Sequence, residues 1–305
     1  MRVTVANAPI SYGAFELTVG VDPSVPDGEK VLDEVRAAGY AGIDLGPVGY
    51  LGGGTVLAER LAGRRLGLAG AYLEFPFTDH DALAGLYPDL DAMLDTFDAV
   101  RSVVPGPAPR PTIADAGSDA RRRAPGRSHA DHSRGLDEAG WERLAVGLRS
   151  VVGRCRDRGY EPTFHHETGT FVEAPWEIER VLEVSDVGLC LDTGHFFVGG
   201  GDPVAAIRDW SSRINHVHVK DAVRSVMDGI VADNEPATAI WSREAFCALG
   251  EGDVDVAGVL AELERIDYEG WLVVEQDIFP QTPERFAQAI EDQRRNRQFL
   301  ARHQV

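Results

Sequence analysis

Histidines and acidic residues are concentrated in four short segments of the second half of the chain. Five of the nine histidines lie between positions 165 and 218. The four segments read His165-His166-Glu167, Asp192-Thr193-Gly194-His195, His216-Val217-His218 and Glu275-Gln276-Asp277. Imidazole nitrogens and carboxylate oxygens suit hard or borderline divalent cations such as Mn²⁺, Co²⁺, Mg²⁺, Fe²⁺ or Zn²⁺. These segments therefore predict a divalent metal site.

Three of these residues are expected to share the cation. A carboxylate that is buried without a partner costs several kcal/mol or shifts its pKa. Asp192 and Glu275 therefore need a cation or a shared proton if they meet at one place, and His218 can supply a nitrogen ligand. We expect the fourth ligand from the strand that ends in the first of these segments, the fifth in the chain. Side chains two residues apart on a strand share a face. His165 and Glu167 share that face and are alternatives, whereas His166 is expected to be structural.

Eight short apolar runs must position these side chains. Each is almost continuously apolar, which is typical of strands buried on both faces in a parallel sheet covered by helices. They span residues 3–6, 41–45, 67–73, 111–114, 162–166, 187–191, 214–219 and 271–275. Helical patterns lie between them at 28–38, 88–103, 138–158, 176–184, 202–211 and 256–265, and a last one covers 283–302.

This alternation over 305 residues predicts an α/β fold of the (β/α)₈ or TIM barrel type. An open doubly wound sheet is the alternative, but it usually carries a G-x-G-x-x-G loop after its first strand, which residues 7–16 (NAPISYGAFE) lack. In a barrel the carboxyl ends of the strands meet at one mouth, where active sites lie. We therefore expect residues 1–305 to form one domain with the four segments at that mouth.

Two long loops, at about 117–135 and 224–249, interrupt the alternation. Both follow a strand directly, so we expect them at the mouth, where long loops are commonly lids or binding loops. Ile240, Trp241 and Phe246 give the second loop apolar anchors that we expect to be packed. The first loop contains Arg121-Arg122-Arg123, which we expect to be a solvated cluster.

The charge balance argues against some classes of partner. The chain has 49 acidic and 30 basic residues and a net charge of -19, which repels phosphate backbones, so we expect no nucleic acid partner. No apolar run approaches the ~18–20 residues of a membrane helix, and no signal peptide is recognisable, so we expect no membrane partner. Three scattered cysteines are too few for a disulfide framework or a thiolate metal site, which fits a cytoplasmic protein.

The motifs resemble those of a known family. HHETGT (165–170), DTGHFFVGGGDP (192–203), RINHVHVKD (213–221), LGEGDVD (249–255) and YEGWLVVEQD (268–277) are similar to motifs of the xylose isomerase-like barrel superfamily of sugar isomerases, epimerases and dehydratases. Within it, they resemble most closely the inosose (2-keto-myo-inositol) dehydratase-like proteins, as does the first-strand loop at 7–16. The matching motifs span residues 7–277.

The resemblance implies a divalent metal, most often Mn²⁺ or Co²⁺, held by a strand-five residue together with Asp192, His218 and Glu275. It also implies that His195 contacts substrate oxygens. The dehydratase pattern has another histidine where this chain has Glu167, whereas the strand-five glutamate of the wider superfamily usually falls nearer His165. We assign Glu167 to the metal and His165 to catalysis, and the reverse assignment stays open.

The neighbouring reactions all remove a proton from a carbon next to a carbonyl. A metal would stabilise the resulting enediolate, and a base with a pKa near the working pH would take the proton. The base would be Glu275 or whichever of His165 and Glu167 does not bind metal. His195 or Lys220 would protonate a departing hydroxyl. The prediction is a metal-dependent carbon–oxygen lyase that dehydrates a cyclic keto-polyol such as 2-keto-myo-inositol. Its partner would be a small sugar or cyclitol substrate. The chain could also assemble as a homo-oligomer.

Three alternatives remain open at this point. The first is a sugar isomerase or epimerase of the same superfamily, which returns the proton without losing water. The second is an enzyme that cleaves a C-glycoside or 3-keto-glycoside, suggested by the altered strand five and the arginine-rich loop. The third is a metal-free sugar-binding barrel or partner subunit with no turnover of its own.

Overall fold

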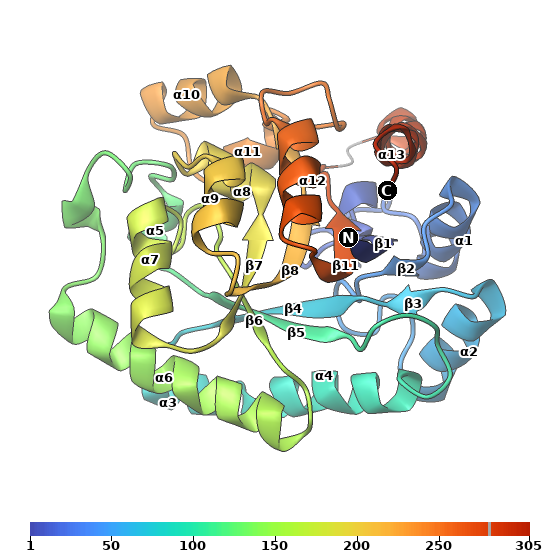
Figure 1. Ribbon diagram of the computed structural model, residues 1–305, viewed down its shortest axis with the longest axis horizontal. Helices are drawn as coiled ribbons and strands as arrows, with labels where there is room; N and C mark the ends of the chain where they lie inside the picture. Colours follow the sequence, from blue (N-terminus) through green and yellow to red (C-terminus); the bar gives the residue numbers. More distant parts are fainter. Residues whose placement is uncertain (280–281) are drawn as a thin grey trace.

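Nine parallel strands form one sheet in the computed structural model, which describes residues 1–279 and 282–305. In spatial order they are β3 (Gly67–Leu68), β2 (Gly42–Ile43), β1 (Arg2–Asn7), β11 (Glu269–Val274), β8 (Ile214–Val219), β7 (Gly188–Asp192), β6 (Thr163–His165), β5 (Arg110–Asp115) and β4 (Gly70–Phe75). Only Ala69 separates β3 from β4. Its amide donates to the Ile43 carbonyl and its carbonyl accepts from the Arg110 amide, both at 2.9 Å. The two ends of the sheet thus meet in one interrupted strand, and the predicted (β/α)₈ barrel is confirmed (Figure 1).

Small apolar side chains pack around a tryptophan inside the barrel. Ala6, Ala69 and Val273 form a buried cluster with Trp271 on β11. A Cβ atom at Gly42 or Gly67 would lie 2.5 or 2.6 Å from the Trp271 ring, so the ring occupies space that only glycine leaves free. Trp271 lies near the start of β11 and therefore closes the floor of the barrel, opposite the mouth.

Helices surround the barrel and bury their apolar faces against the strands (Figure 1). They are α1 (Gly28–Ala38), α2 (Gly54–Arg64), α3 (His80–Gly85), α4 (Tyr87–Val100), α6 (Glu138–Asp157), α7 (Pro175–Val184), α9 (Pro203–Asp209), α12 (Val256–Arg265) and α13 (Pro283–Arg302). In α1 the Asp27 side chain accepts from the Lys30 amide at 2.9 Å, and Gly39 ends the helix with a φ of 91°. All seven predicted helices are present. The sequence did not predict α2, which starts after glycines without a side-chain cap.

Both long loops are folded. The first contains α5 (Asp119–Arg122) and a 3₁₀ turn, η2 (His132–Arg134); another such turn, η1 (Pro9–Tyr12), follows β1. The second contains α10 (Arg224–Ala232) and α11 (Thr238–Ser242), and it is closed by the antiparallel pair β9 (Asp221–Ala222) and β10 (Phe246–Cys247). Figure 1 shows α10 and α11 above β7 and β8. Ile240 and Phe246 are buried, as predicted, and the half-buried Trp241 packs against Phe15.

The two loops contact each other beside the mouth. The Ala237 amide donates to the Arg122 carbonyl at 2.7 Å, and the Arg127 guanidinium donates to Asn234 Oδ1 at 3.0 Å. The two loops are therefore joined to each other by hydrogen bonds. In the ranges 1–279 and 282–305, no helix is both long enough and apolar enough to cross a lipid bilayer.

Candidate metal centre at the barrel mouth

Three strand ends bring the three predicted ligands together. Asp192 is the last residue of β7, His218 lies on β8, and Glu275 follows β11. His218 Nδ1 lies 3.2 Å from Glu275 Oε2 and 3.7 Å from Asp192 Oδ2. All three residues are buried. They are far apart in the sequence, but they meet because β11, β8 and β7 are neighbours in the barrel.

The two carboxylate oxygens of Asp192 have different roles. Oδ1 accepts the His195 amide at 2.9 Å and thereby caps α8 (Thr193–Val198), which fixes the side chain. Oδ2 points into the site and accepts no hydrogen bond from the described residues. The motif DTGH therefore combines a helix start with an orientated carboxylate oxygen that is available to a cation.

Lys220 lies at the centre of the acidic cluster. Its Nζ atom lies 3.1 Å from Asp192 Oδ2, 3.1 Å from Glu275 Oε2 and 2.7 Å from Asp277 Oδ1. Burial alone would lower the pKa of Lys220, but the surrounding carboxylates, Asp192 foremost, raise it well above its usual value. The ammonium thus supplies positive charge to a site rich in carboxylates.

Lys220 pairs with these three acids and not with the adjacent Asp221. The Asp221 carboxylate instead accepts the amides of Gly250, Gly252 and Val254 at 2.8, 3.0 and 3.1 Å. It therefore ties the LGEGDVD segment (249–255) to β9, which follows β8 directly. Lys220 points the other way along the strand alternation, into the mouth.

His165, the last residue of β6, and Glu167, which follows that strand, contact different partners. His165 Nε2 is 3.6 Å from Asp192 Oδ2, and the His165 and His218 rings are 5.1 Å apart. Glu167 instead contacts His195, with Oε1 3.0 Å from Nε2, and approaches His165 Nδ1 at 3.5 Å. Burial raises the pKa of Glu167 to about 8 and lowers that of His165 to about 4. His165 is therefore a neutral imidazole near pH 7.

His195 and His166 are both held by hydrogen bonds. The Thr168 hydroxyl lies 2.9 Å from His195 Nδ1, which leaves Nε2 to face Glu167 and Asp277. His166 Nε2 accepts the Asp192 amide at 3.2 Å. The bond from Asp192 gives His166 the structural position that the strand alternation predicted.

The donor atoms fit a divalent cation. Both ring nitrogens of His218 and Oδ2 of Asp192 lack a hydrogen-bond partner among the described residues. One oxygen or nitrogen from each of Asp44, His218 and Glu275 also lies within 4.8 Å of the other two. Buried polar atoms without partners are rare in proteins. Several buried nitrogen and oxygen atoms without partners lie together here, and a divalent cation would satisfy them.

Asp44 was missed by the sequence reasoning. It follows β2, is 5% exposed, and lies with Oδ2 3.8 Å from His218 Nε2. Burial raises its pKa to about 7. Its position within the apolar run 41–45 was the available signal, because a single acid inside such a run is costly unless it is partnered.

The comparisons with known proteins identify the family of the chain. The family model described as "Xylose isomerase-like TIM barrel" matches residues 112–301. The chain belongs to this family. An inosose dehydratase of Geobacillus kaustophilus (strain HTA426) is 34% identical over 148 residues, or 48% of each protein. An inosose dehydratase of Lacticaseibacillus casei is 32% identical over 153 residues, 49% of this chain and 51% of the relative.

The chain spans about half the length of the curated relatives it matches. Among solved structures, D-allulose 3-epimerase from Methylomonas sp. has a TM-score of 0.66 at 13% identity, and the match covers 99% of this chain and 98% of the epimerase. The IolI protein with a binding zinc atom has a TM-score of 0.64 at 14% identity, and the match covers 96% of both chains. At these identities, the likeness shows the fold.

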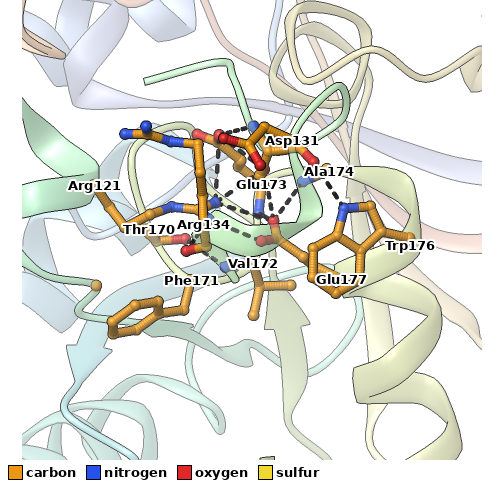
Figure 2. A network of polar contacts seen from close by, with 12 residues as sticks. Arg121, Asp131, Arg134, Thr170, Phe171, Val172, Glu173, Ala174, Trp176 and Glu177 are labelled. Atoms are coloured by element: carbon orange, nitrogen blue, oxygen red, sulfur yellow. Dashed lines mark hydrogen bonds and ion pairs between the residues drawn. The ribbon is translucent and has the colours of Figure 1, made fainter. Parts of the chain in front are cut away.

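In this xylose isomerase-like barrel, the first long loop (about 117–135), called the first insertion below, is anchored by a buried ion-pair network (Figure 2). The Arg121 guanidinium donates to both carboxylate oxygens of Glu177, at 2.9 and 3.0 Å, and lies 3.3 Å from Glu173. The Ser128 hydroxyl also contacts both glutamates, at 2.9 and 3.0 Å. The prediction that Arg121 belongs to a solvated cluster is wrong: its side chain is 3% exposed, because two buried acids at the start of α7 require it.

The network reaches the candidate metal centre through the turn after β6. Glu173 Oε2 accepts the Gly169 amide at 2.7 Å and the Gly126 amide at 3.1 Å. Gly169 follows Thr168, whose hydroxyl contacts His195. In this member of the family, the insertion thus helps to fix the turn that orients a site histidine.

Proposed function

We propose that the chain is a divalent-metal-dependent lyase that removes water from a cyclic keto-polyol such as 2-keto-myo-inositol. The observation that carries the proposal is the convergence of Asp192, His218 and Glu275 at the mouth, with buried donor atoms that lack hydrogen bonds within the described ranges. The partial matches to proteins named inosose dehydratase support the choice of substrate class.

Asp192, His218 and Glu275 would hold the metal, and the contacts favour His165 over Glu167 as the fourth ligand. His165 Nε2 is the strand-five atom that faces Asp192 Oδ2, at 3.6 Å. The Glu167 carboxylate is directed at His195 and at the far nitrogen of His165. A bound divalent cation would supply Lewis-acid stabilisation of negative charge that develops on the substrate's carbonyl and neighbouring hydroxyl.

Glu167 is then the residue best placed to take the proton from the substrate carbon. Its carboxylate borders the cluster, is about one-fifth exposed, and is held by His195 at 3.0 Å. Lys220 is the proposed proton donor to the departing hydroxyl. The neighbouring acids Asp192 and Asp277 keep its amine protonated as an ammonium beside the proposed metal ligands. His195, fixed by Thr168, would bind a substrate hydroxyl.

The experiment is a turnover assay with the full chain reloaded with Mn²⁺ or Co²⁺. Incubation with 2-keto-myo-inositol should give a product that absorbs in the ultraviolet, as an enone or diketone does, and D192N should give none. Metal-loaded protein that forms no such product from inososes would refute the dehydratase. Uptake of solvent deuterium into the substrate without loss of water would identify an epimerase or isomerase instead.

The proposal also includes a cellular compartment and a class of binding partner. The partner is a small sugar or cyclitol bound at the mouth. Each of the three cysteines lies in the described part of the chain and is a free thiol, which fits a reducing compartment such as the cytoplasm.

A further inference from the structure

A thiol lies directly beneath the carboxylates of the candidate metal centre. Cys190 is on β7, two residues before Asp192, so both side chains point to the same face of the strand. Cys190 Sγ and one ring nitrogen each of His165 and His218 all lie within 4.8 Å of one another. The three residues are at most 2% exposed.

The two histidines have nitrogens available to this thiol's neighbourhood. Both nitrogens of His218 make no hydrogen bond within the described ranges, and one nitrogen of His165 lies near the thiol. His218 therefore belongs to two donor sets, one with Asp44 and Glu275 and one with His165 and Cys190. The first set offers two oxygens and a nitrogen, whereas the second offers two nitrogens and a sulfur.

The composition of the second set selects among metals. Carboxylate oxygens suit Mg²⁺ and Mn²⁺, but a thiolate with imidazoles suits Zn²⁺ and Co²⁺. The scatter of the cysteines along the sequence excludes a site made of thiolates alone, and this arrangement needs only one. When a cation binds, the sulfur–hydrogen bond is replaced by a sulfur–metal bond, and the proton leaves to the buffer.

We propose that Cys190, His165 and His218 form a thiolate–imidazole donor set at the barrel mouth, and that a cation bound through this set is Zn²⁺ or Co²⁺ in preference to Mn²⁺. This inference rests on the metal centre of the proposed function. It adds a ligand and a metal preference that the pattern of acids and histidines alone does not contain.

Cobalt spectroscopy tests the ligand directly, without a substrate. The metal-free full chain is mixed with one equivalent of Co²⁺, and its absorption spectrum is recorded. A cobalt–thiolate bond gives an intense near-ultraviolet charge-transfer band, whereas oxygen and nitrogen ligands give only weak visible bands. The wild type should show the intense band, C190S and C190A should lose it, and the matched variants C155S and C247S should keep it.

The outcomes separate this inference from the proposed function. Visible cobalt bands without the intense band in the wild type, or an intense band that persists in C190S, would overturn the thiolate ligand while leaving the metal centre. A wild-type chain that retains no cobalt would overturn both. In competition titrations, the ratio of Zn²⁺ to Mn²⁺ affinity should fall at least tenfold in C190A and stay unchanged in C155S; an equal ratio in C190A would count against the proposal.

Discussion

The Nζ atom of Lys220 lies 3.1 Å from Oδ2 of Asp192, the carboxylate oxygen that helix α8 leaves unused. One ammonium thus faces three acids, and a divalent cation at the same mouth would share those acids with it. A bound metal and the lysine would therefore be linked through their common partners. The linkage gives the first prediction.

Replacing Lys220 by methionine should destabilise the metal-free protein more than the metal-loaded one. Removing one partner of a buried ion pair typically costs about 3–5 kcal/mol, because the remaining charges stay unpaired. A bound cation would compensate part of that loss, so Mn²⁺ or Zn²⁺ should raise the Tm of K220M by more than it raises the wild-type Tm. The control is K30M, at the chain's other lysine, which is exposed. Equal metal-induced shifts in K220M and wild type would disprove the linkage.

The variants H165Q and E167Q should separate the two possible strand-five ligands. H165Q should weaken metal binding by at least roughly 10- to 100-fold, the range that even outer partners of metal ligands contribute. E167Q should keep its metal, because Glu167 contacts His195 rather than Asp192. Elemental analysis after dialysis against a graded chelator measures both. Loss of metal in E167Q with retention in H165Q would restore the assignment of Glu167 as the ligand.

Gly194→Ala should displace Lys220 without changing any charge. A Cβ atom at Gly194 would lie 2.6 Å from Cγ and 2.9 Å from Cβ of Lys220. We expect G194A to lose turnover by about 100-fold, as small misplacements of catalytic groups do, with destabilisation of about 1–3 kcal/mol. The matched control is G153A in α6, where nothing lies within 4 Å and a gain of ~0.5–1 kcal/mol is expected. Wild-type turnover in G194A would show that the position of Lys220 is immaterial.

Arg121→Met should be the most destabilising change in the first insertion. It leaves Glu173 and Glu177 buried without their cation, so urea unfolding should show a loss of about 3–5 kcal/mol. R122M should cost at most about 1 kcal/mol, because Arg122 is 47% exposed and its pair with Glu74 is on the surface. The loss should shrink in an E173Q/E177Q background. Similar losses for R121M with and without those glutamates would contradict the ion-pair explanation.

Asp115→Asn should make stability less dependent on pH. Burial raises the pKa of Asp115 to about 6 from 3.8, although the Gly117 and Phe171 amides that it accepts lower the pKa in part. The folded state therefore holds a proton that the unfolded state has lost, and wild-type stability falls as pH rises from about 4 to about 6. Above that window the asparagine variant should be more stable than the wild type by on the order of 2 kcal/mol, and the difference should vanish near pH 4.

Stability curves across this pH window check the prediction for Asp115. The asparagine oxygen can still accept the Gly117 and Phe171 amides, which Asp115 Oδ1 binds at 2.7 and 3.2 Å. D119N, at an acid that is 84% exposed, should follow the wild-type curve. A constant difference between D115N and wild type at every pH would rule out the titration.

The barrel was predictable from sequence because strand burial leaves a strong pattern. All eight apolar runs became strands, since parallel strands covered on both faces read as continuous apolar stretches. The interruption at Ala69 did not show, because one residue that pairs with both neighbours looks like any other strand residue. Helix α2 also lacked a signal, since glycines precede it instead of a capping side chain.

The site was predictable where motifs end strands and not where one residue stands alone. Asp192, His218 and Glu275 stood out because each closes a strand whose neighbours carry similar groups. Asp44 and Cys190 each lie inside an apolar run, where an inward-facing group cannot be told from a core residue without the register. The partners of Arg121 were equally hidden, because Glu173 and Glu177 lie more than 50 positions away and in another element.

The buried network around Arg121 has a consequence for how this barrel can be re-engineered. Segments 118–135 and 169–177 are bound by charges that face no water, so neither half is complete when moved alone. A chimera in which this barrel receives a foreign loop after β5 would leave Glu173 and Glu177 buried without Arg121. Grafting the loop together with the start of α7 would transfer a self-contained module, and altered substrate ranges obtained by recombination should respect that boundary.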